Sequence, residues 1–377
     1  MRIAVINRMF SRAGGGAESY SVALVQQLAT KHEIHVFAQE TDQPVPGVAY
    51  HRIFCLSKKP RWINQLLFAL ATWWRTRRGF DVVHSHENTW HGQVQTIHVR
   101  PTRFNLFAGR RGAALLMRWL KVLSSPRLVT YVLLESARFR TKAGRRIVAA
   151  SDNLLAECQQ AYPCSRPMLS VVTPGTVLPS HALAPSVARR QLGLPAEGKC
   201  LLFVANDYAR KGLDAALRAL ALLPSDSCLA VAGSLRQAPR YQKLAADLGL
   251  AQRVHFLGSF NDLSLVYPAA DCLVHPTLED SFAMVVLEAM AHGVPVVVSG
   301  PKHCGISQKL VDGGNALLLD DPRDASGLAQ RINAVLTQPE LAARLRQQGL
   351  AFARTHSWEH AGQIYEQLYR QAVAAKP

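Results

Sequence analysis

The sequence of 377 residues has few cysteines and no long apolar run. Its seven cysteines are scattered, odd in number and without a C-x-x-C pair, so a disulfide framework or a structural zinc site is not expected and a reducing compartment fits best. No stretch reaches the roughly 18 to 20 apolar residues that span a bilayer. The start, MRIAVINRMF, does not resemble a secretory signal. We therefore expect a cytoplasmic protein whose membrane contact is peripheral.

Acidic residues are scarce in the N-terminal half. Residues 1–180 hold 24 Lys/Arg and 9 Asp/Glu, or +15, whereas residues 181–377 hold 19 and 17, or +2. The excess is densest in residues 100–146, where twelve basic residues accompany a single acid, Glu135. Such a patch attracts a polyanion, and a solvated basic surface is the alternative. The residues expected to meet an acceptor or a membrane are Arg100, Arg103, Arg110, Arg111, Arg118, Trp119 and Lys121.

The segment AALLMRWLKVL, residues 113–123, combines an apolar stripe at near-helical spacing with a Trp and a basic rim. This combination is typical of a helix that lies in an anionic membrane interface, and a helix packed on its own domain is the alternative. Nucleic acid is not expected as a partner, because no known RNA- or DNA-reading motif occurs.

Apolar runs alternate with helical patterns twice along the chain. In the first half the runs include residues 2–7, 33–39, 81–86, 145–151 and 168–175. A break with Pro174, Gly175 and Pro179 follows, and the second half restarts with KCLLFVAND, DSCLAVAGS, RVHFLGS, DCLVHPT and GVPVVVSG. This alternation predicts an α/β protein with two doubly wound, Rossmann-like domains that face each other across a cleft. We expect them to comprise residues 1–175 and 176–356.

Ligands of such sheets bind beyond the carboxyl ends of the strands, so residues just after the strands are the candidates for chemistry. The first run is followed by RAGGGAE, residues 12–18, whose glycines would let the backbone approach a phosphate at a helix start. It is neither G-x-G-x-x-G nor a P-loop, which disfavours hydride-transfer cofactors and ATP. A glycine turn needed for packing is the alternative.

Two cations, Arg210 and Lys211, stand at a loop-to-helix junction after the first strand of the second domain. A guanidinium fork and an ammonium point charge together suit a diphosphate, and charge on a departing diphosphate is a large electrostatic term in transfer chemistry. A solvated basic pair is the alternative.

The string HPTLEDSFAMVVLEAMAHGVPVV, residues 275–297, places Glu279 and Asp280 before a helix expected over residues 282–290, and Glu288 within it. Carboxylates accept hydrogen bonds from vicinal hydroxyls, and N–H groups left unpaired at a helix start suit a sugar or a phosphate. An N-cap acid and a surface Glu are the alternatives. The N–H groups expected to be available belong to Phe282, Ala283 and Met284.

Four histidines, His84, His86, His91 and His98, fall close together in the sequence. Only Glu87 accompanies them at a ligand-like spacing, so no metal site is expected. His86 ends a strand and is expected to contact donor or acceptor.

The sequence resembles the retaining GT-B glycosyltransferases. The resemblance rests on EDSFAMVVLEAMAHGVPVV, on ARKG at residues 209–212 and on GGGAE at residues 14–18, with support from TIH (96–98), VTPG (172–175) and SWE (357–359). It is strong over residues 200–320 and loose over 40–140. Within the family, RKGLDAALRALALLP and VHFLGSFNDLSLVYPAADCLVHP are similar to glucosyltransferases of lipopolysaccharide inner-core assembly, in which a basic helix also touches the membrane.

The resemblance implies metal-independent transfer of a hexose, with retention, from a nucleotide-sugar to an anionic glycolipid acceptor at the inner face of the cytoplasmic membrane. No cofactor beyond this donor, expected to be a UDP-sugar, is implied. Carried over by position, Arg210 and Lys211 bind the diphosphate, Glu288 the ribose and Asp280 the sugar hydroxyls. His98 falls at the catalytic centre, and residues 357–377 return to the N-terminal domain. The remaining donor contacts implied are Gly15, Gly16, Val254, Phe256, Leu257, Phe282, Ala283 and Met284.

Three departures from the family pattern leave the donor sugar open. The family usually has Glu where Asp280 stands, and Gly where Ser281 and Ala283 stand. The Asp carboxylate reaches roughly 1.5 Å less far than that of Glu, so the neighbouring Glu279 is a second candidate for the sugar. The lipopolysaccharide enzymes have Asp where His98 stands. Alternatives are an exopolysaccharide or lipid-linked acceptor, another GT-B activity, and a non-enzymatic basic binder.

Overall fold

The computed structural model describes residues 1–11, 15–42, 44–181 and 183–375. Internal contacts divide the chain into two units. Unit 1 comprises Met1–Pro174 and Trp358–Pro377, and unit 2 comprises Gly175–Ser357. Residues 12–14, the first part of the expected phosphate loop, lie outside the described residues.

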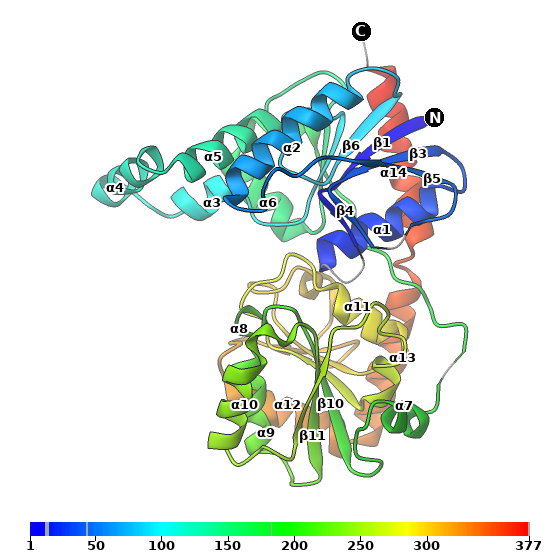
Figure 1. Cartoon of the computed structure of the whole chain (residues 1–377). Coiled ribbons are helices and arrows are strands. Elements are labelled where there is room, and N and C mark those ends of the chain that lie inside the picture. Colours follow the sequence, from blue (N-terminus) through cyan, green and yellow to red (C-terminus); the bar gives the residue numbers. More distant parts are fainter. Residues whose placement is uncertain (12–14, 43, 182, 376–377) are drawn as a thin grey trace. The chain divides into compact units, whose positions relative to one another are not determined.

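Unit 1 is built on a parallel sheet of seven strands in the order β5-β3-β1-β6-β7-β8-β9 (Figure 1). Its central strands are apolar runs buried on both faces, as expected where helices cover both faces of a parallel sheet. A separate pair, β2 (Met9–Phe10) and β4 (Glu40–Thr41), lies outside this sheet. The strands of the large sheet are β1 (Arg2–Ile6), β3 (Glu33–Ala38), β5 (Val48–Arg52), β6 (Val82–Ser85), β7 (Val94–Ile97), β8 (Arg146–Ala149) and β9 (Leu169–Val171).

The last helix of the chain, α14 (Trp358–Ala374), belongs to unit 1, where it packs against α1, β6 and β7. Three helices, α3, α4 and α5, pack on one another and form a projection of this unit with α4 at its tip (Figure 1). The remaining helices of unit 1 are α1 (Gly16–Leu28), α2 (Arg61–Thr76), α3 (Thr102–Phe107), α4 (Gly112–Leu123), α5 (Pro126–Arg138), α6 (Asp152–Ala161) and the 3-10 helix η1 (Pro163–Met168).

Unit 2 is a parallel sheet of six strands in the order β12-β11-β10-β13-β14-β15. The first strand of unit 2, β10, lies inside the sheet. The next two strands, β11 and β12, are added on one side of β10, and the chain then crosses to β13 on its other side. The order reverses between β10 and β13, where doubly wound sheets bind their ligands. The strands are β10 (Lys199–Val204), β11 (Ser227–Ala232), β12 (Val254–Gly258), β13 (Cys272–His275), β14 (Val296–Ser299) and β15 (Leu317–Leu319).

The helices of unit 2 bury their apolar faces against this sheet. The core includes Leu213 and Leu217 of α9, Tyr241 of α10 and Ile332 of α12, packed over β10 and β11. The helices are α7 (Pro185–Gln191), α8 (Tyr208–Lys211), α9 (Leu213–Ala221), η2 (Leu235–Gln237), α10 (Ala238–Asp247), η3 (Tyr267–Ala269), α11 (Met284–Ala291), η4 (Ile306–Lys309), α12 (Ala325–Thr337) and α13 (Pro339–Arg354).

These two sheets confirm the predicted α/β architecture of two doubly wound units. One predicted boundary was wrong, because α11 begins at Met284 and not at residue 282. The residue before it, Ala283, has φ 70° and ψ 69°, a left-handed conformation that interrupts the helix. It is the one non-glycine residue with positive φ in the described ranges.

Candidate functional site

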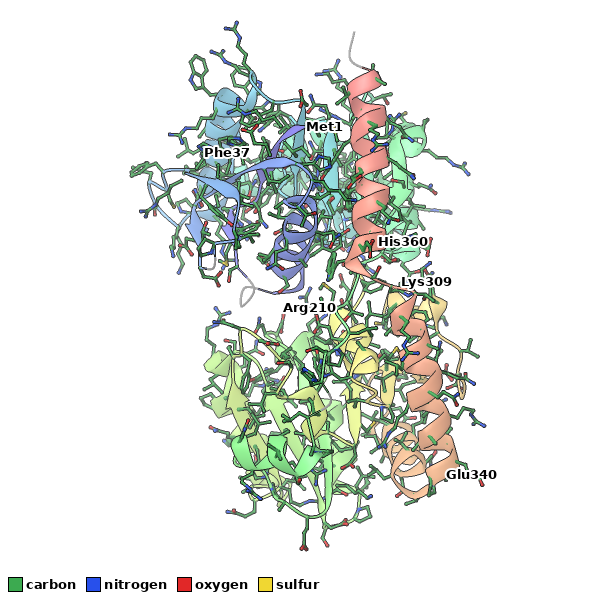
Figure 2. The ribbon with its side chains drawn as sticks, turned by 90° about the vertical axis from the view of Figure 1, so that its right-hand side faces the viewer. Met1, Phe37, Arg210, Lys309, Glu340 and His360 are labelled. Carbon is green, nitrogen blue, oxygen red and sulfur yellow. The ribbon has the colours of Figure 1, made fainter. Side chains whose placement is uncertain are left out.

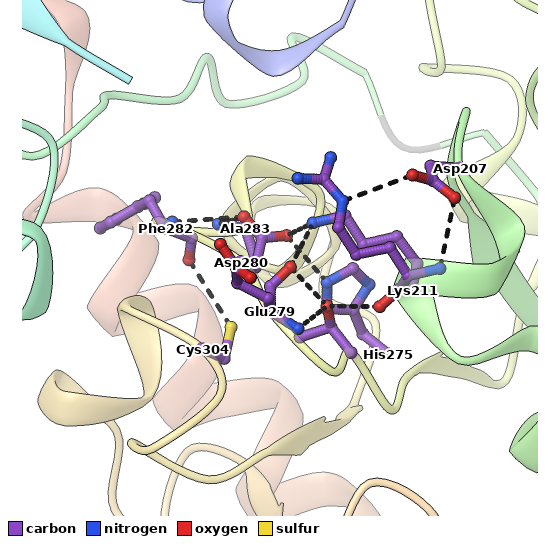
Figure 3. A network of polar contacts seen from close by, with 10 residues as sticks. Asp207, Lys211, His275, Glu279, Asp280, Phe282, Ala283 and Cys304 are labelled. Atoms are coloured by element: carbon purple, nitrogen blue, oxygen red, sulfur yellow. Dashed lines mark hydrogen bonds and ion pairs between the residues drawn. The ribbon is translucent and has the colours of Figure 1, made fainter. Parts of the chain in front are cut away.

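A buried ion pair joins the two predicted motifs of unit 2 (Figure 3). Lys211 ends α8, which follows β10, and Asp280 follows β13. The Lys211 Nζ lies 2.5 Å from the Asp280 Oδ2 and also donates to the Glu279 carbonyl oxygen at 3.2 Å. The two side chains are 14% and 16% exposed. The structure therefore brings together two residues that are 69 positions apart, at the place where the strand order of unit 2 reverses.

The Asp280 carboxylate has four partners. Its Oδ2 also meets the His275 Nε2 at 3.1 Å, and its Oδ1 accepts from the backbone N–H groups of Phe282 and Ala283 at 3.3 and 3.0 Å. A carboxylate offers about four lone-pair sites, so this set saturates it. Burial alone would raise the pKa of Asp280, but Lys211 and His275 together hold that pKa well below its usual range. Asp280 is ionised in the folded protein.

Two backbone N–H groups that the sequence analysis expected to be available are engaged by Asp280, which corrects that expectation for Phe282 and Ala283. An Asp side chain that accepts from the N–H groups two and three residues onward forms a tight local turn. The N-cap alternative for Asp280 thus describes part of what this side chain does. Ala283 is 4% exposed, and Met284 is half-buried at the first position of α11.

Backbone hydrogen bonds to neighbouring elements hold the loop that carries Asp280. The Leu278 N–H donates to the Arg210 carbonyl at 2.9 Å, which fixes this loop to α8. The Asp280 N–H donates to the His303 carbonyl at 2.8 Å, and the Gly305 N–H donates to the Asp280 carbonyl at 3.0 Å. Groups so restrained are preorganised for a ligand.

Arg210 differs from its neighbour Lys211 in its surroundings. Its side chain is 51% exposed, and its Nε lies 3.5 Å from the Asp207 Oδ2. Figure 2 shows Arg210 at one end of unit 2 and Glu340 at the other. A guanidinium held by one exposed carboxylate can turn toward an incoming anion at little cost.

Glu288 is half-buried on α11, and a neighbouring side chain holds its carboxylate, unlike that of a freely solvated surface Glu. The Tyr267 hydroxyl donates to its Oε2 at 2.6 Å, and burial raises the pKa of the Glu288 carboxyl. A carboxylate fixed at one oxygen can accept from vicinal hydroxyls with the other. Tyr267 and His275 were missed as partners. The end of a strand marks His275, but no local signal connects Tyr267 with a residue 21 positions away.

The segment expected to lie against a base forms β12. Val254 is buried there, and Phe256 and Leu257 are half-buried. The Phe256 ring lies 6.2 Å from that of Tyr208, which precedes Arg210 and Lys211 in α8. The strand is therefore packed beside the helix that carries the two cations.

In unit 1, His98 follows β7 and forms a pair with His86, which follows β6. The His86 Nδ1 and the His98 Nε2 lie 2.9 Å apart, with their rings stacked at 5.2 Å. Burial, together with Arg138, lowers the pKa of His98 to about 3, and burial lowers that of His86 well below its usual range. Both rings are neutral at neutral pH. One of the two facing nitrogens therefore carries a hydrogen and donates it to the other in a hydrogen bond. The Tyr20 ring packs edge-on against His98 at 4.9 Å.

A chain of buried hydrogen bonds fixes α14 to this part of the sheet. His84 contacts the Tyr369 hydroxyl and the Thr96 Oγ1, each at 2.7 Å. Thr96 in turn contacts the Tyr365 hydroxyl at 2.7 Å, which meets that of Tyr20 at 2.9 Å. Burial lowers the pKa of His84 to about 3, so this network is built on a neutral imidazole.

The two described glycines of the expected phosphate loop stand at the start of α1. Gly15 is its N-cap, with φ 150°, and a Cβ on Gly15 would lie 3.1 Å from the Glu18 carboxylate. A Cβ on Gly16 would meet no atom within 4 Å. Glu18 thus lies beside the loop, where burial raises the pKa of its carboxyl.

The basic window of unit 1 is in part internal. Arg138 and Arg145 are 7% and 5% exposed, and Arg138 donates to the Gln95 side chain at 2.9 Å and to the Thr96 carbonyl at 2.6 Å. These two arginines support the sheet and add nothing to a surface patch. Arg100 is ion-paired with Glu157 at 2.5 Å.

The other predicted patch residues lie on or before the α3–α4 projection. Arg103 covers the Tyr162 ring at 5.2 Å, and Arg110 donates to the Leu106 carbonyl at 2.7 Å. Arg111 is the N-cap of α4, and Lys121 is exposed in its last turn. Arg118 is half-buried on the same helix.

The helix α4 turns most of its apolar side chains outward. Leu116, Met117, Leu120 and Leu123 are 59–68% exposed, and Val122 is its one buried residue in the described range. Trp119 stacks on Phe107 at 4.5 Å and remains 41% exposed. The outward apolar face does not fit the alternative of a helix that buries its apolar stripe on its own domain.

Two absences hold for the residues that the structure describes. None of their helices combines the length and the apolar character needed to cross a bilayer. No group of three or more His, Cys, Asp or Glu side chains among them is placed to hold a metal ion.

Comparison with known families assigns each unit. Residues 14–178 match the family described as glycosyltransferase family 4, and residues 186–351 match the family described as glycosyl transferases group 1. The lipopolysaccharide glucosyltransferase WaaG of Escherichia coli strain K12 is 28% identical over 222 residues, which cover 56% of this chain and 58% of that protein. A D-inositol 3-phosphate glycosyltransferase of Corynebacterium efficiens is 30% identical over 237 residues, or 59% of this chain and 55% of that protein. The chain thus spans less than two thirds of these two relatives.

Solved structures agree on the fold. The crystal structure of WaaG, a glycosyltransferase involved in lipopolysaccharide biosynthesis, superposes with a TM-score of 0.84 at 20% identity, over 97% of this chain and 99% of that chain. Anabaena Alr3699/HepE in complex with UDP-glucose gives a TM-score of 0.74 at 18% identity, over 98% of this chain and the whole of that chain. The match to WaaG shows that the fold is GT-B, with two Rossmann-like parallel-sheet domains.

Proposed function

We propose that this chain, which belongs to the GT-B glycosyltransferases of the glycosyl transferases group 1, moves a hexose from a UDP-sugar to a phosphorylated inner-core saccharide of lipopolysaccharide. The observation that carries the proposal is the constellation of Arg210, Lys211, Asp280 and Glu288 at the switch point of unit 2. Residues 175–357 would bind the donor. Residues 1–174, completed by α14, would bind the acceptor.

Each part of a nucleotide-sugar has a counterpart in this constellation. Arg210 and Lys211 supply two positive charges for the diphosphate, one exposed and adaptable and one fixed. Glu288, fixed by Tyr267, would accept the ribose hydroxyls. Val254, Phe256 and Leu257 of β12 would line the base. The UDP-glucose complex of the structural relative HepE supports uridine as that base.

Because the Asp280 carboxylate already has four partners, we propose that it has a positioning role and that Glu279 holds the donor sugar. Asp280 positions Lys211 and builds the turn at Phe282 and Ala283, so a sugar hydroxyl that reached it would replace one of four partners. Glu279 is the adjacent carboxylate. Replacing Glu279 by Gln tests this division: if Glu279 holds the sugar, the variant binds UDP-glucose more weakly but UDP like the wild type. Asp280→Asn should weaken the binding of both ligands, because Asp280 positions Lys211 at the diphosphate. Unchanged binding of UDP-glucose by Glu279→Gln would contradict the role of Glu279.

We assign the transfer a front-face course with retention and without a metal. The departing diphosphate would take the acceptor proton, and Arg210 and Lys211 would stabilise the charge that develops on it. His98, neutral through its low pKa, is a hydrogen-bonding group at the donor sugar and not a general acid. Gly15 and Gly16 would leave the backbone open to a phosphate at the start of α1.

The acceptor is proposed from charge and from the relatives. The N-terminal half carries +15, which suits a phosphorylated saccharide on an anionic lipid surface. The relatives named for lipopolysaccharide and for D-inositol 3-phosphate both fit an anionic acceptor. The exposed apolar face of α4, with Arg111, Arg118 and Lys121, would hold the protein on the inner face of the cytoplasmic membrane.

Titration calorimetry with UDP-glucose, UDP-galactose, UDP-N-acetylglucosamine and GDP-mannose tests the donor part, without added metal. The proposal expects saturable binding of one UDP-sugar and loss of at least tenfold in affinity in Glu288→Ala. The matched control Glu340→Ala, at the opposite end of unit 2 (Figure 2), should bind like the wild type. Binding of no member of the panel, or equal binding by Glu288→Ala, would contradict the proposed donor site.

A further inference from the structure

The helix α2 has an unusual distribution of apolar side chains. Its buried face combines Phe68 and Ala69 with four polar residues, Asn64, Gln65, Thr72 and Thr76, while its outer face carries large apolar side chains. The outer face of a helix on the surface of a globular protein is usually polar. The exposed apolar side chains of α2 therefore call for a partner that would remove them from water.

The exposed apolar residues form one stripe. At 100° per residue, Ile63, Leu67, Leu70 and Trp74 fall within an arc of about 60°. They are 36%, 40%, 45% and 61% exposed. Trp73 flanks the stripe at 39%, and the preceding segment adds Phe54 and Leu56 at 79% and 73% exposure.

The polar residues on the inner face explain why the helix cannot rotate to bury this stripe. Asn64 and Gln39 exchange side-chain hydrogen bonds at 2.6 and 3.0 Å, and Gln65 donates to the Asn88 carbonyl at 3.1 Å. Thr72 and Thr76 bond to carbonyls of their own helix. Turning Asn64 and Gln65 outward would break the hydrogen bonds that fix α2 to the rest of the unit, so the stripe stays outside.

The surroundings of the stripe are cationic. Residues 53–80 contain six Lys/Arg and no Asp or Glu. Lys58 forms an ion pair with Glu40, whereas Arg77 lies over the Trp74 ring at 3.6 Å and over the Trp73 ring at 6.0 Å. A pair of tryptophans with a guanidinium at the end of an apolar stripe is suited to the boundary between acyl chains and anionic headgroups.

We propose that the outer face of α2, with Phe54 and Leu56, is a bilayer-binding surface that inserts Leu67, Leu70 and Trp74 among lipids and places Arg77 and Arg78 at anionic headgroups. A second copy of the chain fits less well. A symmetric contact would bring the same surface of two chains together, and the cations that flank it would face one another. An anionic bilayer complements both the charge and the apolar stripe.

This surface lies on a different helix from the α4 patch, although α2 and α4 both pack against α5. The inference rests on the proposed association with a membrane, but it does not depend on the proposed transfer reaction. It adds that α4 alone is insufficient, and that unit 1 is held to the bilayer at two places.

Co-sedimentation with vesicles tests the surface. The full chain is mixed with vesicles of phosphatidylcholine, with or without 30% phosphatidylglycerol, as the wild type, as Leu67→Ser/Leu70→Ser and as Arg77→Gln/Arg78→Gln. We expect the serine pair to reduce partitioning at least tenfold on anionic vesicles. The glutamine pair should reduce it about 25-fold, from about fivefold per cation, and only where phosphatidylglycerol is present.

Two controls keep the result specific. Leu222→Ser/Leu235→Ser removes two leucines of unit 2 that are 63% and 51% exposed and should leave partitioning unchanged. Circular dichroism and donor binding equal to the wild type show that the α2 variants are folded.

Three results would overturn the inference. The first is that the α2 variants bind vesicles within twofold of the wild type while Leu116→Ser/Leu120→Ser on α4 abolishes binding. This result would refute the α2 surface but would still support the proposed membrane contact of α4. The second is a dimer in sedimentation velocity that Leu67→Ser/Leu70→Ser dissociates. The third is a wild type that ignores vesicles altogether, which would also refute the proposed membrane association but not the donor site.

Discussion

Replacement of Lys211 by Met should destabilise the protein as well as impair it. The substitution keeps the length of the side chain but removes the charge that lies 2.5 Å from Asp280. Both side chains are less than one fifth exposed, so solvent screens the pair weakly. Removing one partner of such a pair costs about 3–5 kcal/mol. Asp280 would keep His275 and two backbone N–H groups, so we expect a loss near the lower end, about 3 kcal/mol.

Urea unfolding and differential scanning calorimetry measure this loss. For a unit of this size about 3 kcal/mol corresponds to a fall in Tm of about 6–12 °C. The matched control is Lys243→Met, an exposed lysine of α10 in the same unit, which should melt like the wild type. The double variant Lys211→Met/Asp280→Asn removes the uncompensated carboxylate and should recover most of the lost stability.

A Tm of Lys211→Met within 1 °C of the wild type would refute the reasoning, because the pair would then be no more than a surface contact. The structure separates Lys211 from the more exposed Arg210. For Lys211 a loss of stability is the consequence of its ion pair and does not argue against a role at the diphosphate.

Three further predictions concern single side chains. Arg210→Gln should change the free energy of unfolding by less than about 1 kcal/mol, because the ion pair of Arg210 with Asp207 is exposed. The same variant should bind the UDP-sugar about 10- to 100-fold more weakly in calorimetry, and binding equal to that of the wild type would contradict the assignment of Arg210 to the diphosphate. His84 has its pKa lowered to about 3 by burial, so the unfolded chain binds the extra proton and stability falls as the pH drops from about 6.5 to 3. His84→Asn should flatten urea-derived stability against pH by about 1.4 kcal/mol per pH unit, and an unchanged slope would count against a neutral His84. Ala283→Gly should raise stability by about 0.4–1 kcal/mol, because glycine adopts a φ of 70° without strain; a lower Tm would contradict this.

Periodicity predicted the strands that are mostly apolar. The runs at β1, β3, β6 and β8 and five runs in unit 2 were all recognisable, since a parallel strand covered on both faces is rich in apolar residues. β7 was missed because its sequence is VQTI. The buried Gln95 side chain accepts from Arg138, 43 residues away. The buried Thr96 hydroxyl contacts His84 and Tyr365, and no local pattern reveals the distant partners Arg138 and Tyr365.

The residues of the candidate site could be predicted more fully than their contacts. Arg210, Lys211, Asp280 and Glu288 were identified from their motifs, and the structure brings Lys211 and Asp280 into one cluster with His275. The sequence did not reveal that Asp280 has four partners or that Tyr267 bonds to Glu288, because each feature joins residues of separate elements that meet only in the folded unit. The stripe on α2 also escaped notice, since an amphipathic pattern does not show which face is inside.

Sugar transfer itself is the direct test of the central claim. The UDP-sugar chosen by calorimetry is incubated with purified wild-type protein and a phosphorylated inner-core acceptor in the presence of a chelator, and the product is examined by nuclear magnetic resonance for its anomeric configuration. The account predicts a glycosylated acceptor whose new linkage keeps the configuration of the donor, and loss of product in Arg210→Gln and Glu288→Ala. Absence of product with a donor that binds, a requirement for metal, or an inverted linkage would contradict it.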